Sequence, residues 1–431
     1  MSRPSVTLVG GGMVAHDQLL PSLYHLERLG VIEEIRVCAQ RGRTLKALAE
    51  SPALERAFPG QSFLPFPDLE SDLDEAHPKL FEQVIAQLPP RNIVVVATPD
   101  HLHFDVIMAA LASNQHVCSV KPLVLSVRES IQIEAEAFAR GLLVGIEYHK
   151  RFDDRSLMAR QKYREGLFGE FRLGSACLLE KWYYRRSNFQ NWCTAENSDA
   201  FSYIGCHYVD LVHFITGLLP VAVSVYGIRD SYPNGREGFL WTDARVIWNN
   251  GACLNVQNAL GFPDEAPGSN TQGLVMYSSG NGKGALLSHS DQYRGLKHCY
   301  TRAEDAPGAT LYAEPSPDYF QYVDLGGKGL VPVGYGYRSL EYIVRACIRL
   351  ESETSGLAPD GGALGKRRQW LEEIDAAGIM ATPRNSRYNE LVLEAGRLSI
   401  LNGGRETAIH YGEKPGVRFS EMTEGWTRQE A

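Results

Sequence analysis

The first 150 residues alternate short apolar runs with helix-like segments, and no other feature constrains the fold as much. The runs are apolar along nearly their whole length and lie at 6–9, 35–39, 92–97, 116–120 and 142–146. Strands without polar alternation are buried on both faces, which is typical of a parallel sheet between two layers of helices. The sequence therefore predicts an α/β fold that begins with a doubly wound parallel sheet.

The length of the chain predicts two domains, because 431 residues exceed the size of one ordinary hydrophobic core. We place the parallel-sheet domain at 1–150 and a second domain at 151–431, with a C-terminal helix at about 386–402. An acidic, helix-prone stretch between Asp68 and Pro90 is expected to be a peripheral insertion.

Composition and charge limit the classes of partner and the cellular compartment that we expect for this chain. The formal net charge of −8 argues against nucleic acid or an anionic membrane as a partner. No apolar stretch approaches the ~18 residues of a transmembrane helix, and the N-terminus enters a strand without a signal region. The eight cysteines are scattered, without a C-x-x-C pair. We therefore expect a cytoplasmic protein without a disulfide framework or a metal site.

A glycine-rich turn follows the first apolar run and precedes a helical pattern. Residues 10–15 read Gly-Gly-Gly-Met-Val-Ala, a G-x-G-x-x-A motif in which Met13 is also expected to contact the cofactor. Gly10 permits a tight turn, Gly12 lets the backbone approach a diphosphate, and Ala15 permits close helix packing. The motif predicts a dinucleotide site; the alternative is a glycine-rich turn of another doubly wound domain.

The ends of the next strands supply further candidate cofactor contacts. The second strand ends in Gln40, Arg41 and Arg43 without the acid that usually binds a ribose. Gln40 could bind a ribose hydroxyl, and either arginine could bind a 2′-phosphate. Both NAD and NADP are therefore possible cofactors, and tolerance of NADP is slightly favoured. The alternative is that both arginines are solvated.

The run 94–103, VVVATPDHLH, reaches the carboxyl edge of the sheet, where ligands bind in such folds. Thr98 and Pro99 are expected along the cofactor. His103 is expected either to join them or to cap the next helix.

Four runs resemble the glucose–fructose oxidoreductase, inositol dehydrogenase and rhizopine-catabolism family (Gfo/Idh/MocA). They are VATPDHLHFDVIMAALASNQHVCSVKPL, YHKRF, EGLFGEF and GCHYVDLVHFITG. The resemblance extends to about residue 228 and is diffuse beyond it, apart from LVLEAGRLSILNG. It implies an N-terminal Rossmann domain and a C-terminal α/β domain with an open, mostly antiparallel sheet. It also implies a homo-oligomer, a dimer or tetramer, formed through that sheet.

The resemblance implies a catalytic role for Lys121 in the stretch QHVCSVKPLVL. Family members usually have Glu-Lys-Pro here, and this chain has Val120, Lys121 and Pro122. Lys121 is expected beside the nicotinamide, where its ammonium can bind the reacting hydroxyl and stabilise alkoxide charge. Pro122 is expected to line the cofactor. The missing glutamate puts the family's nicotinamide contacts in doubt.

A second catalytic constellation lies at 202–210, SYIGCHYVD. Family members usually show Asp-x-x-x-His or Asp-x-x-x-Tyr here, and this chain has Tyr203 and His207. We expect His207 to be the base, because oxidation of an alcohol also removes the hydroxyl proton. Tyr203 is expected on the same helical face, and Asp210 is a candidate to orient His207. His213 is expected in packing or at the surface.

Substrate contacts are expected from two segments and from the catalytic residues. The YHKRF match contributes Tyr148, His149 and Arg151, and Lys121, His207 and Asp210 are expected to touch the substrate as well. The run 180–193 is rich in aromatic residues, which could form a platform for a sugar ring or pack in the core: Trp182, Tyr183, Tyr184 and Trp192. Arg185 and Arg186 could bind an anionic group, and the run 289–296 could add polar contacts.

Two functional classes follow from these residues. The first is an NAD(P)-dependent dehydrogenase acting on a secondary alcohol of a sugar, glycoside or cyclitol. The second is a redox-neutral, NAD-dependent glycosidase that oxidises, eliminates and reduces, with Tyr203 as an extra base. A dinucleotide-binding regulator without turnover is a third, less favoured interpretation.

Overall fold

The first domain is built on a six-stranded parallel sheet in the order β3-β2-β1-β4-β5-β6. The computed structural model describes residues 3–266, 270–290, 319–358 and 362–421. The strands are β1 (Val6–Val9), β2 (Ile35–Cys38), β3 (Leu64–Phe66), β4 (Ile93–Val96), β5 (His116–Val120) and β6 (Val144–Glu147). This order reverses between β1 and β4, as in a dinucleotide-binding sheet. The predicted doubly wound parallel sheet is confirmed.

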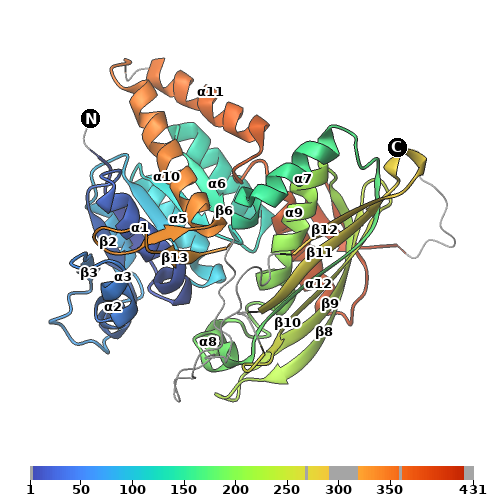
Figure 1. Cartoon of the computed structure of the whole chain (residues 1–431), viewed down its shortest axis with the longest axis horizontal. Coiled ribbons are helices and arrows are strands. Elements are labelled where there is room, and N and C mark those ends of the chain that lie inside the picture. Colours follow the sequence, from blue (N-terminus) through green and yellow to red (C-terminus); the bar gives the residue numbers. More distant parts are fainter. Residues whose placement is uncertain (1–2, 267–269, 291–318, 359–361, 422–431) are drawn as a thin grey trace.

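Helices cover both faces of this sheet because its strands are apolar on both faces (Figure 1). In β4, Ile93 and Val95 join one apolar core, while Val94 and Val96 join the other. The covering helices are α1 (Leu20–Arg28), α2 (Gly42–Ala49), α3 (Pro52–Ala57), α4 (Leu80–Ala86), α5 (His103–Ala112) and α6 (Val127–Arg140).

The chain returns to the first domain near its end, which corrects the single expected boundary at residue 150. Helices α10 (Tyr335–Thr354) and α11 (Gly362–Ala377) lie beside α6 and α1 in Figure 1, far from most of the second sheet. In α10, Leu340, Ile343, Val344, Cys347 and Leu350 recur at helical spacing and join the apolar core of β1 and β4. The hairpin β13 (Gln321–Val323) and β14 (Val331–Val333) precedes α10.

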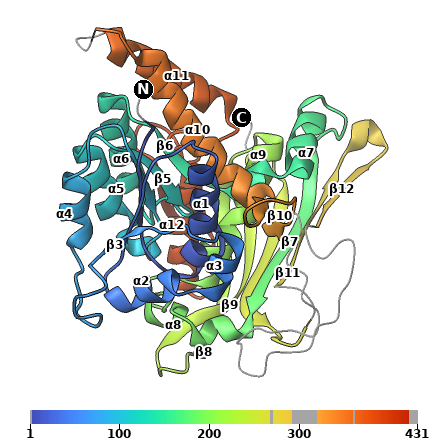
Figure 2. The same cartoon turned by 60° about the vertical axis from the view of Figure 1, so that its left-hand side comes forward.

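The second domain is an eight-stranded, mostly antiparallel sheet in the order β12-β11-β7-β10-β9-β8-β15-β16, in which β7 and β10 pair in parallel. Its strands are β7 (Phe171–Lys181), β8 (Pro220–Ser231), β9 (Glu237–Trp248), β10 (Cys253–Phe262), β11 (Asn270–Ser278), β12 (Ala285–His289), β15 (Thr407–His410) and β16 (Gly416–Phe419). Helices α7 (Asp154–Arg164), α9 (Cys206–Thr216) and α12 (Tyr388–Ile400) lie between this sheet and the first domain (Figures 1 and 2). Among the described residues, no helix lies on the other face of this sheet (Figure 2).

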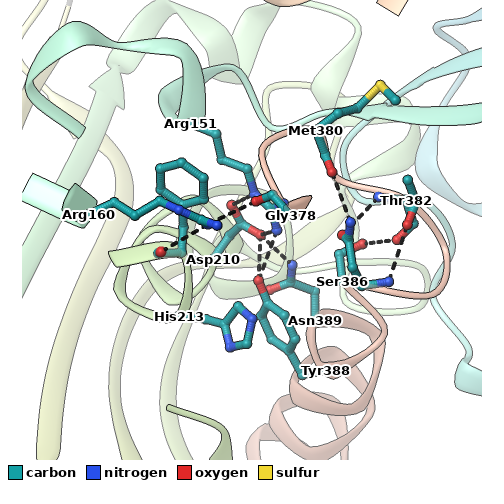
Figure 3. Close-up of polar contacts among 12 residues, drawn as sticks. Arg151, Arg160, Asp210, His213, Gly378, Met380, Thr382, Ser386, Tyr388 and Asn389 are labelled. Atoms are coloured by element: carbon teal, nitrogen blue, oxygen red, sulfur yellow. Dashed lines mark hydrogen bonds and ion pairs between the residues drawn. The ribbon is translucent and has the colours of Figure 1, made fainter. Parts of the chain in front are cut away.

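A buried ion pair joins the end of the first domain to helices of the second (Figure 3). Arg151 lies in the short turn η3 (His149–Phe152) after β6, and it is 1% exposed. Its Nε and Nη2 donate to the two carboxylate oxygens of Asp210 on α9, at 2.8 and 2.6 Å. Tyr388 Oη and Asn389 Nδ2, at the start of α12, donate to Asp210 Oδ1 at 2.8 and 2.9 Å. One carboxylate therefore fixes three segments of the chain.

We expect Asp210→Ala to destabilise the protein strongly, because it leaves the Arg151 guanidinium buried without a counterion. Breaking a buried pair in this way costs about 3–5 kcal/mol, which corresponds to a loss of roughly 3–6 °C in Tm for a chain of 431 residues. Calorimetric unfolding would measure it, with Asp243→Ala as control, because Asp243 is exposed on β9 and makes no ion pair within the described residues. Equal Tm values for both variants would contradict the assignment.

Candidate active site

The glycine-rich turn has the shape that a dinucleotide diphosphate needs. Gly10 has φ +116°, and a Cβ there would collide with the carbonyl oxygen of Ala97, so only glycine suits this position. Gly12 is exposed and nothing lies within 4 Å of a Cβ built on it. The helical turns begin at Met13, and Ala15 is fully buried beneath them. An open backbone position at a helix start fits a diphosphate group.

The end of β2 keeps one of the two arginines available for a cofactor. Gln40 and Arg41 are exposed, and Arg41 makes no ion pair in the described part of the chain. Arg43 instead pairs with Asp74 of the acidic insertion. Arg41 is therefore the better candidate to meet a 2′-phosphate.

The loop after β4 is held by a buried histidine. The ring nitrogens of His103 face the carbonyl oxygens of Thr98 at 2.9 Å and Pro122 at 2.8 Å, and the residue is 0% exposed. His103 therefore does not offer a cofactor contact, which corrects the expectation, but it ties the β4 loop to the Lys121 loop. Thr98 and Pro99 remain partly exposed, and the buried Thr98 Oγ1 has no partner within the described residues.

Lys121 follows β5 and bridges the two domains. It is 8% exposed, its ammonium donates to the carbonyl oxygen of Tyr203, and Nζ lies 3.7 Å from the centre of the Tyr203 ring. A second buried group nearby, Asp100, was not among the sequence candidates: it is 4% exposed, and burial raises its pKa while His103 and Lys121 oppose the rise. The sequence feature that could have identified Asp100 as a site residue is its position directly after Thr98 and Pro99, at the carboxyl edge of the sheet.

Tyr203 and His207 lie in consecutive helical segments, and both lie near Lys121. Tyr203 lies in a π-helical segment, η5 (Phe201–Gly205), directly before α9, which changes the angular spacing of side chains. The Tyr203 ring packs edge-on against Phe189 and Trp192, with centroids 4.9 and 5.2 Å away, and burial holds its pKa well above the ordinary value. Tyr203 is therefore poorly suited to act as a base.

His207 is buried and electrostatically biased towards the neutral form. It is 7% exposed, and burial, followed by the charge of Lys121, holds its pKa well below the ordinary value. Its Nδ1 is buried without a partner among the described residues, and its ring centre lies 4.8 Å from that of His149. Asp210 contacts Arg151, Tyr388 and Asn389 but not His207, so the expected orienting contact is wrong.

His149 is oriented by an acid that the sequence reading missed. Its Nδ1 lies 3.1 Å from Oε2 of Glu147, the last residue of β6. The other carboxylate oxygen, Oε1, accepts from Gln18 Nε2 at 2.9 Å and from Ser339 Oγ at 2.8 Å. The signal was present in the sequence, because Glu147 is a polar residue at the end of an apolar strand.

Several expected substrate residues lie elsewhere. Tyr148 is 1% exposed and Arg151 is bound to Asp210, so neither can reach a substrate. Trp182, in the turn η4 (Trp182–Arg186), contacts Trp241 and stacks under the Arg185 guanidinium, whose Nη1 is 2.6 Å from an Asp230 oxygen. These contacts lie on the second sheet and do not include Lys121, His149 or His207.

The remaining expectations divide between the core and residues that are not described. Trp192 is 9% exposed, and Tyr184 stacks on Phe189, so this part of the aromatic run is core packing. The partly buried His213 ring packs on Tyr388 with centroids 3.9 Å apart. Of the run 289–296, residues 291–296 lie outside the described part.

Within the described residues there is no group of three or more potential metal ligands. No helix described here is long and apolar enough to cross a bilayer.

Comparisons with known proteins agree with this geometry. The model of the Gfo/Idh/MocA family, an oxidoreductase family with an NAD-binding Rossmann fold, matches residues 5–148. The scyllo-inositol 2-dehydrogenase (NADP(+)) of Bacillus subtilis is 28% identical over 103 residues, 23% of this chain and 26% of that protein. The D-glucoside 3-dehydrogenase of Escherichia coli is 23% identical over 225 residues, 51% of this chain and 56% of that protein.

The solved structures extend the likeness in fold to nearly the whole chain. The scyllo-inositol dehydrogenase of Lactobacillus casei, solved with NAD(H) and scyllo-inositol, has a TM-score of 0.57 at 13% identity and covers 94% of this chain and 99% of that one. The sequence matches are shorter: in three curated bacterial relatives they span only 24% to 28% of the relative's length. The match to the Gfo/Idh/MocA oxidoreductase family, with its NAD-binding Rossmann fold, therefore covers residues 5–148.

Proposed function

We propose that this protein is an NAD(P)-dependent oxidoreductase that acts on a secondary alcohol of a sugar, glycoside or cyclitol. The observation that carries the proposal is the convergence of Lys121 with two histidines, His149 and His207, at the carboxyl edge of the Rossmann sheet. The named relatives include dehydrogenases of an inositol and of a glucoside, which supports this substrate class.

Each group of residues at the site has a separate role in the proposed hydride transfer. When bound, the nicotinamide accepts a hydride from the carbinol carbon. The glycine-rich turn binds the diphosphate through backbone N–H groups and the helix start. Lys121 donates a hydrogen bond to the reacting oxygen and stabilises its developing negative charge. A neutral histidine of the His149–His207 pair takes the hydroxyl proton, so that the alcohol becomes a carbonyl.

Aromatic side chains shield the histidines from water. The rings of Tyr319 and Tyr335 lie 4.9 and 5.5 Å from the His149 ring, and Tyr319 Oη donates to Gln18 Oε1. A drier environment strengthens the interaction of the Lys121 ammonium with a developing alkoxide.

The redox-neutral glycosidase is less well supported. That reaction needs a second base for the proton next to the new carbonyl, and Tyr203 was the candidate. Its ring is packed between Phe189, Trp192 and the Lys121 ammonium, and its raised pKa disfavours the phenolate. Simple alcohol oxidation needs no such group.

The open face of the second sheet supports a homo-oligomer. Large apolar side chains are more than half exposed on this face: Leu173, Tyr226, Ile228, Tyr277 and Leu286. Large exposed apolar patches are typical of protein interfaces. We infer that a second copy covers it, and that the protein works in the cytoplasm, where its free cysteines stay reduced.

We expect Gly12→Val to weaken cofactor binding without loss of stability. The new side chain has open space in the protein but fills the place of the diphosphate. Isothermal titration with NAD and NADP should show a loss of at least about tenfold, or ~1.4 kcal/mol, at unchanged Tm. If the wild type binds neither dinucleotide, the proposal fails.

Arg41→Ala should weaken NADP more than NAD, because only NADP loses a charge-assisted partner, worth about 1.5–3 kcal/mol. Arg43→Ala is the matched control, since Arg43 already pairs with Asp74. Titrations of both variants with both cofactors measure the difference. Equal losses of affinity for NAD and NADP in Arg41→Ala would indicate that this arginine faces solvent and does not contact the 2′-phosphate.

Lys121→Met should lower turnover by roughly 10²–10³-fold, the range for removal of one oxyanion donor. The methionine keeps most of the apolar stem, so dinucleotide affinity should change little. Absorbance of the reduced nicotinamide measures turnover on a panel of sugars, glycosides and cyclitols. Lys162→Met, at an exposed lysine of α7, serves as control. Near-normal turnover of Lys121→Met would leave this lysine a structural role only.

A further inference from the structure

The Glu147 carboxylate is arranged to present one oxygen to His149. Glu147 is 2% exposed, and its Oε1 is occupied by two donors, Gln18 Nε2 and Ser339 Oγ. Its Oε2 is left for Nδ1 of His149 at 3.1 Å. Gln18 is itself fixed, because its Nε2 also donates to the Gly336 carbonyl oxygen at 3.0 Å and its Oε1 accepts from Tyr319.

This geometry selects one tautomer of His149. A carboxylate oxygen only accepts hydrogen bonds, so the proton of a neutral His149 must be on Nδ1. Nε2 then carries a lone pair. The same relation between an acid and a histidine prepares the base of serine proteases.

His207 has no comparable partner. Its Nδ1 is buried without a hydrogen bond among the described residues, and the residue four positions earlier is Tyr203, which is not an acid. The carboxylate of Asp210 instead accepts hydrogen bonds from Arg151, Tyr388 and Asn389. Nothing in the described part of the chain therefore fixes the His207 tautomer.

Strand pairing places the oriented histidine next to the catalytic lysine. Val120 and Glu147 are direct partners in the β5–β6 pair, so Lys121 and His149 both follow the carboxyl edge of adjacent parallel strands. Gln18 lies on the helix that follows the glycine-rich turn, within η1 (Ala15–Leu19). The acid that orients His149 is thus connected to the dinucleotide-binding turn.

We propose that His149 is the general base of the reaction and that Glu147 is its positioning residue, an inference that rests on the proposed function. The hydroxyl O–H bond breaks and the proton passes to Nε2 of His149. The carbinol C–H bond breaks at the same time, its electron pair leaves as hydride to the oxidised nicotinamide, and the C–O bond becomes a carbonyl. His207 packs against His149 and holds the ring in place.

The first test requires no substrate. Nitrogen-15 NMR of histidine-labelled protein should show His149 protonated at Nδ1 in the wild type. In Glu147→Gln the amide oxygen can keep the bonds from Gln18 and Ser339, so the amide NH₂ faces Nδ1 and the proton should move to Nε2. A wild-type proton on Nε2, or an unchanged tautomer in the variant, overturns the proposal.

The second test uses turnover of the wild type's best alcohol from the panel. We expect Glu147→Gln and His149→Gln each to lower kcat by roughly 10²–10⁴-fold, as for a base in the wrong tautomer or a missing base, with dinucleotide affinity within about threefold of wild type. Ser339→Ala, which removes one donor to Oε1, should cost less than about tenfold. His207→Gln should also cost less than His149→Gln.

The outcomes separate the two proposals. If the wild type binds no dinucleotide and oxidises nothing, the proposed function fails, and the NMR result still decides whether Glu147 orients His149. If the wild type turns over but His207→Gln is the more severe loss and Glu147→Gln is nearly normal, His207 is the base and this inference is wrong.

Discussion

The buried carboxylate of Glu147 is the point on which the arrangement of the site depends. A buried acceptor must be matched by donors, because leaving it unsatisfied costs about 1–3 kcal/mol or more. The donors here come from three other segments: Gln18 after the glycine-rich turn, His149 after β6, and Ser339 on α10. Their bonds keep the glycine-rich turn, the candidate base His149 and helix α10 in fixed positions relative to one another.

The lysine site shows how the chain accommodates two departures from the pattern that is usual in the family it resembles. Val120 and Tyr203 stand where a glutamate and an aspartate are usual, so the Lys121 ammonium lacks two acids. It is instead held by the Tyr203 carbonyl oxygen and the face of the Tyr203 ring. A cation over an aromatic ring is worth about 0.5–2 kcal/mol. A neutral partner holds the ammonium without cancelling its charge, which then remains available to a developing alkoxide.

Sequence patterns predicted the parts of the structure that depend on local periodicity and strand order. The apolar runs predicted the parallel sheet, and Thr98 and Lys121 follow β4 and β5 at its carboxyl edge. The failures involve contacts between distant segments. Asp210 binds Arg151 and Tyr388, which are 59 and 178 residues away. No local pattern showed that Tyr203 lies in a π-helical segment, Phe201–Gly205. Nothing local in the sequence showed that α10 packs on the first domain.

The same burial that prepares the site makes the fold sensitive to acid. His116, His207 and His213 all have pKa values held below the ordinary one, chiefly by burial, and that of His213 is about 4. As the pH falls through about 6.5, the unfolded chain binds protons at these residues while the folded chain does not. Protons then favour the unfolded state, so stability decreases towards lower pH and is fully present above the unfolded pKa. For His207, the burial that keeps the ring neutral beside Lys121 at neutral pH therefore also lowers the stability of the folded protein in acid.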